Sequence, residues 1–201
     1  MKVSIIIPYK DDRGYLEQAI ESIEKQSYKN YEVILSQSNN LVGYNLNRGI
    51  EKATGDVIRY LCDDDMLTDN SLIDTVNRFS GDFIHSNAFN FYENGRVFRH
   101  IPKLKNPKLI DLKRQNHFHG GTVVYHASVF DRFGLFDESL WTGEEYDFNL
   151  KLLYSGARVG YVNAFTYFYR RHSLQKSLGN TCVEYQSKRQ EVMQQIKQRY
   201  K

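Results

Sequence analysis

Three consecutive carboxylates in the first third of the chain are well suited to binding a cation. Asp63, Asp64 and Asp65 come directly after the apolar run Tyr60-Leu61-Cys62. Adjacent carboxylates repel one another, and a bound cation or several hydrogen-bond donors would relieve that repulsion. Mg²⁺ and Mn²⁺ prefer carboxylate oxygens and often complete their coordination shells with substrate phosphates. The alternative is a solvated turn before a helix, where acidic residues favour the helix dipole.

A second acidic group lies at the start of a predicted helix over Tyr146–Tyr154. Glu144, Glu145 and Asp147 follow a tryptophan, a threonine and a glycine in this segment. Carboxylates at a helix start can simply favour the helix dipole. A carboxylate with an ordinary pKa of about 4.3 is also ionised at neutral pH, and can take a proton from a hydroxyl that it touches. Both interpretations are open from the residues alone.

The residues before position 62 predict a unit that places the first acidic group. Apolar runs and helical spacing alternate over Val3–Ile7 (strand), Gly14–Gln26 (helix), Val33–Leu35 (strand), Leu46–Ala53 (helix) and Val57–Leu61 (strand). This alternation is typical of a parallel, right-handed α/β unit. Ligands of such sheets bind beyond the carboxyl ends of the strands, which is where the three aspartates fall. We therefore favour a divalent metal site over a solvated turn.

The pattern changes in the rest of the chain. We expect strands over Asp82–His85, Phe89–Tyr92, Arg96–Ile101, Gly120–Tyr125, Arg158–Val162 and Phe165–Tyr169. We expect helices over Asp69–Phe79, Leu109–Arg114, His126–Phe133, Tyr146–Tyr154 and Val183–Tyr200. A turn at Glu93-Asn94-Gly95 joins two of the strands as a hairpin.

Composition excludes several classes of protein. The 201 residues include 41% hydrophobic and 25% charged residues, as in a globular domain. No apolar run reaches the roughly 20 residues needed to cross a bilayer, so no transmembrane segment is expected. The net charge of +3 does not indicate nucleic-acid binding. Two cysteines, Cys62 and Cys182, form no disulfide framework, which favours a cytoplasmic location.

Several motifs together resemble family 2 glycosyltransferases. The opening of that family is similar to Ser4–Tyr9, Tyr15–Ile23 and Gln26–Tyr28. Its second block is similar to Asn47–Ile50 and Ala53–Asp56, and its Asp-x-Asp metal motif to Tyr60–Asp65. The matches follow in order along nearly the whole chain. The resemblance implies an α/β GT-A fold, with a Rossmann-like, mixed but mostly parallel sheet, flanking helices and a smaller acceptor-side subregion. It also implies inverting transfer from a nucleotide-sugar.

The resemblance divides one domain, 1–201, into three parts. Residues 1–100 would bind the nucleotide-sugar, 101–182 would bind the acceptor and catalyse transfer, and 183–201 form a C-terminal helix. The nucleotide-sugar contacts it implies are Pro8, Tyr9, Asp11, Gln37, Arg48, Asp63 and Asp64. Two positions depart from the family pattern: Ser36–Asn39 replace an acidic pair that helps to read the base, and Cys62 stands where the metal motif often begins.

The resemblance also assigns metal and catalytic roles. Asp64 would bind Mn²⁺ or Mg²⁺ with help from Asp65 and His172. Apart from the resemblance, Arg170, Arg171 and Lys176 could neutralise the diphosphate, because guanidinium groups bind phosphate oxygens, or could equally form a solvated edge. The segment from Trp141 is similar to the Trp-x-Gly-Glu-Asp pattern of inverting enzymes, which makes Glu145 the preferred base and leaves Glu144 and Asp147 as alternatives. Trp141 and Gly121 are the expected acceptor contacts. His117-Phe118-His119 is weak as a zinc motif because no further ligand lies at metal-binding spacing.

Two other functions remain open from the sequence. A nucleotidyltransferase can share this architecture, although the acidic segment Lys10–Gly14 lacks the glycine-rich, basic loop typical of such enzymes. A non-catalytic nucleotide- or glycan-binding domain is the second alternative, and intact carboxylates at both acidic groups count against it. We expect a UDP-sugar donor, a glycan or glycoconjugate acceptor, no nucleic-acid partner and, as one possibility, membership of a longer multidomain protein.

Overall fold

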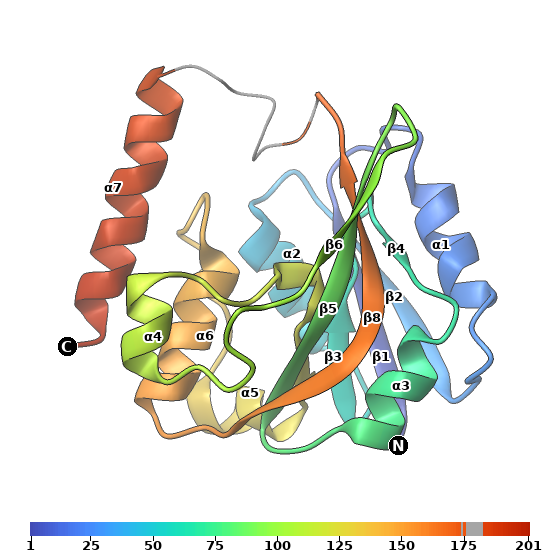
Figure 1. The fold of residues 1–201 in the computed structure, drawn as a ribbon, viewed down its shortest axis with the longest axis horizontal. Coiled ribbons are helices and arrows are strands. Elements are labelled where there is room, and N and C mark those ends of the chain that lie inside the picture. The colour runs from blue at the N-terminus through green and yellow to red at the C-terminus, as the bar shows by residue number, and fades with distance from the viewer. Residues whose placement is uncertain (174, 176–182) are drawn as a thin grey trace.

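The computed structural model describes residues 1–173, 175 and 183–201 (Figure 1). Its first elements are β1 (Val3–Tyr9), α1 (Leu16–Glu24), β2 (Tyr31–Gln37), α2 (Val42–Ile50) and β3 (Val57–Tyr60). Strand β1 pairs in parallel with β2 on one side and with β3 on the other. Its β-branched residues are buried on both faces because helices cover both faces of a central parallel strand. The predicted parallel α/β unit is confirmed.

The remaining elements extend this sheet and cover it. They are β4 (Met66–Leu67), α3 (Ser71–Arg78), β5 (Phe83–Tyr92), β6 (Val97–His100), α4 (Leu109–Arg114), the 3₁₀ turn η1 (Gly120–Thr122), β7 (Val124–His126), α5 (Ser128–Phe133), α6 (Glu144–Tyr154), β8 (Val159–Arg171) and α7 (Val183–Arg199). The strand order is β2-β1-β3-β7-β5-β8-β4, and β6 pairs with β5. The pairings make β1, β2, β3, β5 and β8 point one way, while β4, β6 and β7 run against them.

Strands β5 and β8 are each continuous, whereas the sequence predicted two pieces in each region. Polar residues interrupt the apolar pattern, but they are buried and hydrogen-bonded. Ser86 Oγ lies 2.6 Å from Thr166 Oγ1, and Tyr161 donates a hydrogen bond of 2.6 Å to Asn87. The register shifts at Asn87, where a bulge takes up the extra residues of β8. Pairing between distant strands therefore overrides the local pattern.

The predicted strand over Gly120–Tyr125 is wrong for its first half. Gly120–Thr122 form η1, closed by a hydrogen bond from Thr122 to the His119 carbonyl, and β7 begins only at Val124. The two-residue strand β4 has no signal in the sequence, because its existence depends on pairing with the distant β8. Both deviations lie next to the candidate site.

Two hydrophobic cores fill the two sides of the sheet. One contains Ile6, Phe83, Tyr125 and Phe148 and lies under α2, α5 and α6; the other contains Ile5 and Leu72 and lies under α1 and α3 (Figure 1). Among the residues that the structure describes, no helix has the length and apolar character needed to span a membrane.

Candidate active site

A cleft of about 680 Å³ opens beyond the carboxyl ends of β1 and β3. Nine of the predicted site residues line it: Pro8, Tyr9, Asp11, Asp63, Asp64, Asp65, Gly121, Glu144 and Glu145. The aspartates follow the ends of strands, whereas Glu144 and Glu145 stand at the start of α6, some eighty residues later in the chain. The fold therefore brings the two acidic groups of the sequence into one cleft.

Arg13 neutralises part of the acidic loop that follows β3. One of its guanidinium nitrogens lies 3.2 Å from Asp63 Oδ1 and 3.0 Å from Asp64 Oδ2. Burial raises the pKa of Asp63, an effect that the positive charge of Arg13 partly offsets. Sequence reasoning missed Arg13, because its contact with the acidic loop spans about fifty residues of chain.

Asp65 holds the acidic loop against β8. The Tyr167 hydroxyl donates to its Oδ2 at 2.7 Å, and the backbone N–H of Arg170 donates to its Oδ1 at 2.8 Å. Its side chain is buried, and burial raises the pKa of this carboxyl well above its usual range. Both oxygens have protein donors, so the geometry makes Asp65 a positioning residue first.

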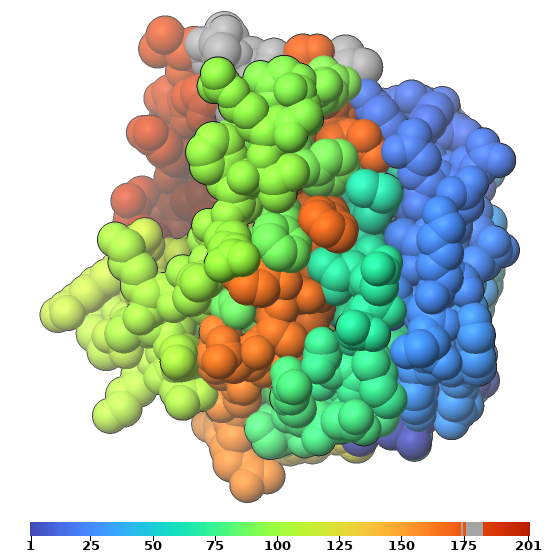
Figure 2. Space-filling view, turned by 45° about the vertical axis from the view of Figure 1, so that its right-hand side comes forward, coloured from blue at the N-terminus to red at the C-terminus, as the bar shows by residue number. Residues whose placement is uncertain are grey.

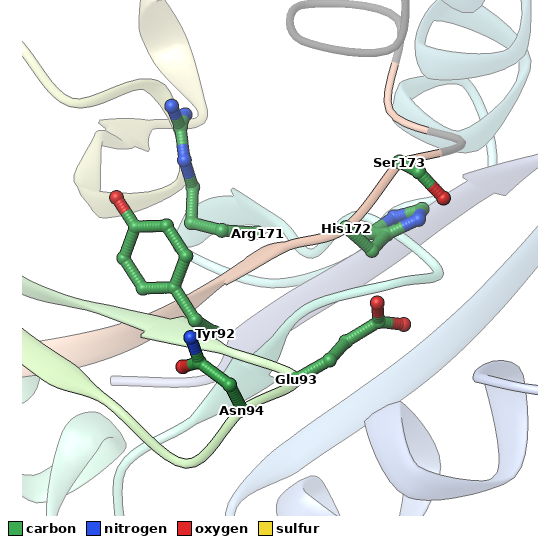
Figure 3. Close-up of a pocket in the computed structure, with 6 residues that line it drawn as sticks. All are labelled: Tyr92, Glu93, Asn94, Arg171, His172 and Ser173. Carbon is green, nitrogen blue, oxygen red and sulfur yellow. The ribbon is translucent and has the colours of Figure 1, made fainter.

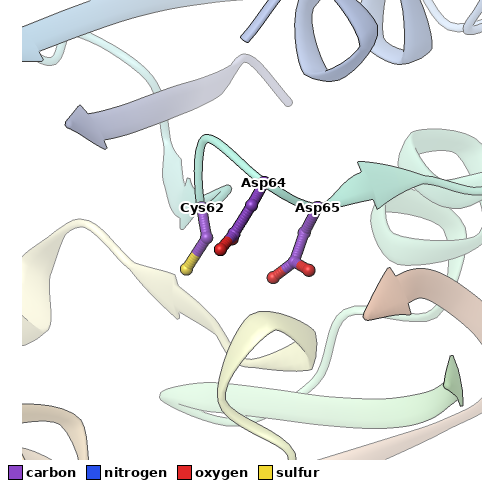
Figure 4. A group of neighbouring side chains, drawn as sticks. All are labelled: Cys62, Asp64 and Asp65. Atoms are coloured by element: carbon purple, nitrogen blue, oxygen red, sulfur yellow. The ribbon is translucent and has the colours of Figure 1, made fainter. Parts of the chain in front are cut away.

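Two side chains at the acidic loop, Asp64 and His172, are placed as neighbouring ligands of a divalent cation would be. Cys62 Sγ and carboxylate oxygens of Asp64 and Asp65 lie within 4.8 Å of one another (Figure 4). His172 Nε2 lies 3.1 Å from Asp64 Oδ2, and two neighbouring ligands of an octahedral ion with bonds of about 2.1 Å stand about 3 Å apart. Burial raises the pKa of the Cys62 thiol, and sulfur suits Mg²⁺ and Mn²⁺ poorly. Asp64 and His172 are therefore the best candidate ligands.

His172 reaches Asp64 from the end of β8. Its side chain is 1% exposed, and it also lines a smaller neighbouring pocket with Glu93 and Arg171 (Figure 3). The Tyr15 ring packs against the imidazole with 5.0 Å between ring centres. His172 thus has a fixed position beside Asp64 although 108 residues separate them in the chain.

Glu145 has the environment expected of a general base. Helix α6 begins at Glu144, two residues before the predicted start, after Gly143 with a φ of 79°. Glu145 Oε1 is buried without a hydrogen-bond partner, and burial raises the pKa of this carboxyl to about 7. Its carboxylate lies against Gly120, where an added Cβ would come within 2.3 Å of Oε2. A carboxyl that titrates near neutral pH is matched to taking and returning a proton.

Gly121 lies on the floor of the cleft under an aromatic ring. An added Cβ would stand 1.9 Å from the Tyr167 ring, and the Gly121 carbonyl accepts a hydrogen bond of 3.2 Å from the buried Arg59. Burial lowers the pKa of Arg59 to about 10. Tyr167 of β8 also donates a hydrogen bond to Asp65. Because Gly121 has no side chain, the Tyr167 ring has room to lie here and to hold the acidic loop.

Two predicted nucleotide contacts do not line the cleft. Gln37, at the end of β2, is exposed and donates a hydrogen bond of 3.2 Å to the Lys10 carbonyl. Arg48 of α2 pairs with Glu51, the residue that directly follows this helix, and lies over the Tyr44 ring. Gln37 is thus near the cleft mouth, whereas Arg48 has partners on its own helix and directly after it.

Asp147 and Trp141 contact the C-terminal helix. Asp147 is buried and accepts hydrogen bonds from Arg199 at 3.0 Å and from the Tyr200 hydroxyl at 2.9 Å. Burial raises the pKa of Asp147, and these donors oppose the rise. The Trp141 ring packs edge-on against Tyr185, with 5.3 Å between ring centres. The geometry therefore favours Glu145 over Asp147 as a base.

Other residues that line the cleft were not predicted to belong to the site. His119 is half-buried in the cleft wall, and the loss of water around its ring, together with the neighbouring His100 and Arg171, lowers its pKa to about 3, so the ring is neutral. Asn45 donates to the carbonyls of Tyr9 and Ser38 and shapes the rim beside β1. Arg189 and Met193 of α7 also line the cleft. The polar sequence of α7 gave no indication of this role.

Of the three predicted diphosphate contacts, the structure describes Arg170 and Arg171. Arg170 is buried, lies 4.5 Å over the Tyr15 ring and donates from Nε to the Asp64 carbonyl at 2.8 Å. Arg171 lies over the Tyr169 ring. Lys176 and Cys182 lie outside the described residues. Among the described residues, the group of three side chains close enough together to hold a metal ion is Cys62, Asp64 and Asp65, and neither His117 nor His119 belongs to such a group.

Comparisons with known proteins agree on one class of enzyme. No family model matches the chain. An uncharacterized glycosyltransferase of Rickettsia conorii is 28% identical over 188 residues, covering 75% of this chain and 31% of the relative. Another from Rickettsia typhi is 26% identical over 186 residues, covering 75% and 58%. The chain thus spans less than two thirds of the length of these relatives.

Solved structures show the same architecture. S. aureus TarS superimposes with a TM-score of 0.69 and 18% identity over 85% of this chain and 37% of TarS. A shorter form of TarS in complex with UDP-GlcNAc gives a TM-score of 0.71 and 16% identity over 91% of this chain and 62% of that chain. The predicted mixed α/β fold is confirmed, and the names of the relatives support the predicted glycosyltransferase.

Proposed function

We propose that the chain transfers a sugar, with inversion, from a UDP-sugar to a hydroxyl of a glycan or glycoconjugate. One observation carries the proposal: a single cleft joins the acidic loop with Asp64 to Glu145, whose pKa is raised to about 7. Relatives named glycosyltransferases, and the TarS structures with UDP and UDP-GlcNAc, support a nucleotide-sugar as the donor. The resemblance of the acidic motif after β3 to that of family 2 glycosyltransferases is our reason for proposing inverting, metal-dependent transfer.

The acidic loop would bind the donor. Pro8, Tyr9 and Asp11 line the cleft at the end of β1 and would contact the nucleoside, with Asp63 at the ribose. Asp64 and His172 would hold Mn²⁺ or Mg²⁺, which supplies positive charge to the diphosphate when bound. Arg13, which now pairs with Asp63 and Asp64, remains close enough to contact the same phosphates.

Glu145 would act on the acceptor. The acceptor oxygen forms a bond to the anomeric carbon as the bond from that carbon to the diphosphate oxygen breaks, and the acceptor proton passes to Glu145. Burial without a hydrogen-bond partner leaves Oε1 free to accept that proton. Glu144 lines the same cleft and would orient the acceptor. Positioning and charge stabilisation account for the remaining catalysis.

A product assay separates this function from its alternatives. The chain is incubated with Mn²⁺, several UDP-sugars and a panel of hydroxyl acceptors, and released UDP is measured with and without acceptor. Acceptor-dependent release of UDP supports the proposal. Release of pyrophosphate from a nucleoside triphosphate and a sugar phosphate would instead identify a nucleotidyltransferase, and tight binding of UDP-sugars without turnover would identify a binding domain.

A matched pair of variants tests the base. Glu145→Gln should lower turnover by about 100-fold or more while the affinity for UDP stays close to that of the wild type. Glu144→Gln removes a neighbouring charge from the same helix turn and should retain more activity. An active Glu145→Gln enzyme would refute the assignment and transfer the role to Glu144.

A further inference from the structure

Residues 96–110 form a surface band that combines positive charge with exposed apolar side chains. The band holds five basic residues and no acidic one, which leaves 22 Lys/Arg against 24 Asp/Glu in the rest of the chain. Its exposed large apolar side chains are Val97 (55%), Phe98 (53%), Ile101 (55%), Leu104 (40%) and Ile110 (55%). Its basic residues are Arg96, Arg99, Lys103, Lys105 and Lys108, all exposed. Positive charge and apolar surface are thus concentrated in the same fifteen residues.

Through Val97 and Arg99 the band continues into an aromatic face of the sheet, whereas Phe98 points to the opposite face and packs against Tyr92. Strand β6 pairs with β5 so that Val97 stands opposite Phe91 and Arg99 opposite Phe89. Phe89 stacks on Phe165 and Phe168 of β8, at 4.3 and 5.1 Å between ring centres. These phenylalanines are only half-buried. Figure 2 shows the band, in light and yellow green, on the surface beside orange atoms of β8.

The position of β6 at the sheet edge does not by itself account for the band. Charged side chains on an edge strand prevent pairing with other strands, and Arg96 and Arg99 are suited to that role. Protection of this kind needs no exposed Phe98 or Ile101, however. It also does not explain why the basic residues continue through Lys103 to Lys108, beyond the end of the strand.

We propose that this band binds the surface of an anionic lipid bilayer. Basic residues near an anionic membrane are attracted to its headgroups, and apolar side chains beside them enter the boundary with the acyl chains. Lysine stems lie along apolar surface while the ammonium groups stay at the headgroups, as Lys103 and Lys105 on either side of Leu104 would do. The band would then hold the protein with its sheet edge on the membrane.

The composition of the band favours lipid over a protein or an RNA. Protein interfaces are depleted in lysine, yet three of the five basic residues here are lysines. A surface that binds RNA through its phosphates does not require exposed aliphatic residues such as Val97, Ile101 and Ile110. At the surface of a bilayer, basic side chains contact anionic headgroups and apolar side chains enter the boundary with the acyl chains. The mixture of both kinds in the band fits such a surface.

Flotation with lipid vesicles tests the proposal. The 201-residue chain is mixed with vesicles of phosphatidylglycerol and phosphatidylcholine, or of phosphatidylcholine alone, at low and at physiological salt. We expect flotation with the anionic vesicles only. Each basic residue near the surface contributes about fivefold to the affinity, so Arg96→Glu/Lys103→Glu/Lys105→Glu should bind about a hundredfold more weakly. Phe98→Ser/Ile101→Ser, which keeps the charge, should bind at least about tenfold more weakly.

A control variant changes the net charge equally at a distant surface. Lys25→Glu/Lys29→Glu/Lys52→Glu should float with anionic vesicles almost like the wild type. All variants should keep the wild-type circular dichroism spectrum because the replaced side chains are exposed. The proposal would be overturned if the wild type did not float with anionic vesicles. It would also be overturned if the control variant lost as much vesicle binding as the band variants. If the wild type forms dimers without lipid and the band variants are monomers, the band is a contact between two copies of the chain. If the chain binds poly(U) but not vesicles, the band binds RNA.

Discussion

Replacing Glu145 by glutamine should stabilise the protein at alkaline pH. In the folded protein the pKa of this carboxyl is about 7, because burial disfavours the ionised form and Oε1 has no donor. In the unfolded chain the carboxyl ionises near its ordinary pKa of 4.5. Wild-type stability should therefore fall as pH rises from about 4.5 to 7 and change no further above that. Glutamine does not ionise, so the variant avoids this loss.

The pKa difference sets the size of the effect. A shift from 4.5 to about 7, at 1.36 kcal/mol for each pKa unit, corresponds to about 3 kcal/mol. This value is an upper bound, since the carboxyl lines a cleft open to water. At pH 8 Glu145→Gln should unfold with a free energy up to about 3 kcal/mol larger than that of the wild type, and at pH 4 the two proteins should be equal.

Urea unfolding followed by circular dichroism, at several pH values between 4 and 8, measures this difference. Glu144→Gln is the matched control, and it should show no such pH-dependent gain over the wild type. A constant difference between wild type and Glu145→Gln across this range would refute the reasoning, because it would mean that Glu145 titrates alike in the folded and unfolded chains. A gain confined to low pH would have the wrong sign and refute it equally.

Three further substitutions test the parts of the site separately. Asp64→Ala should remove the increase in UDP affinity that Mn²⁺ gives in calorimetry, and equal wild-type affinity with and without Mn²⁺ would contradict the metal assignment. Asp147→Ala should destabilise the protein by about 2 kcal/mol in urea, since Arg199 loses a charged acceptor, while UDP affinity stays unchanged; weaker UDP binding would contradict a purely structural role. Gly121→Ala should lower stability by about 1–3 kcal/mol through overpacking against Tyr167, and an unchanged melting temperature would show that the ring has room to move.

The sequence predicted the parts of the fold that depend on local pattern. Short apolar runs and helical spacing were sufficient for the unit from β1 to β3, and the rule that ligands bind at strand ends placed Asp63 and Asp64 in the cleft. The second acidic group was harder. Only the resemblance to a family distinguished Glu145 from its neighbours, and the fold then brought its helix to the same cleft.

Features that depend on distant partners escaped prediction. The hydrogen bond from Tyr167 to Asp65 joins residues 102 positions apart, and it changes an expected metal ligand into a residue held by the protein. Asp147 follows Glu144 by about one helical turn, so the sequence alone left it as a possible base. Its partners, Arg199 and Tyr200, could not be known without the position of α7. Buried polar residues in β5 and β8 broke the strand pattern for the same reason.

The attachment of α7 has a consequence for the design of altered enzymes. Arg189 and Met193 form part of the cleft wall, while the same helix is fastened at its other end through Arg199 to Asp147. The residues of α7 that line the cleft therefore lie on different turns from the residue that anchors the helix. Libraries that vary positions 189 and 193 while retaining 199 would change the cleft wall and leave the strand-end residues untouched, so that variants with altered substrate preference can be sought without redesigning the fold.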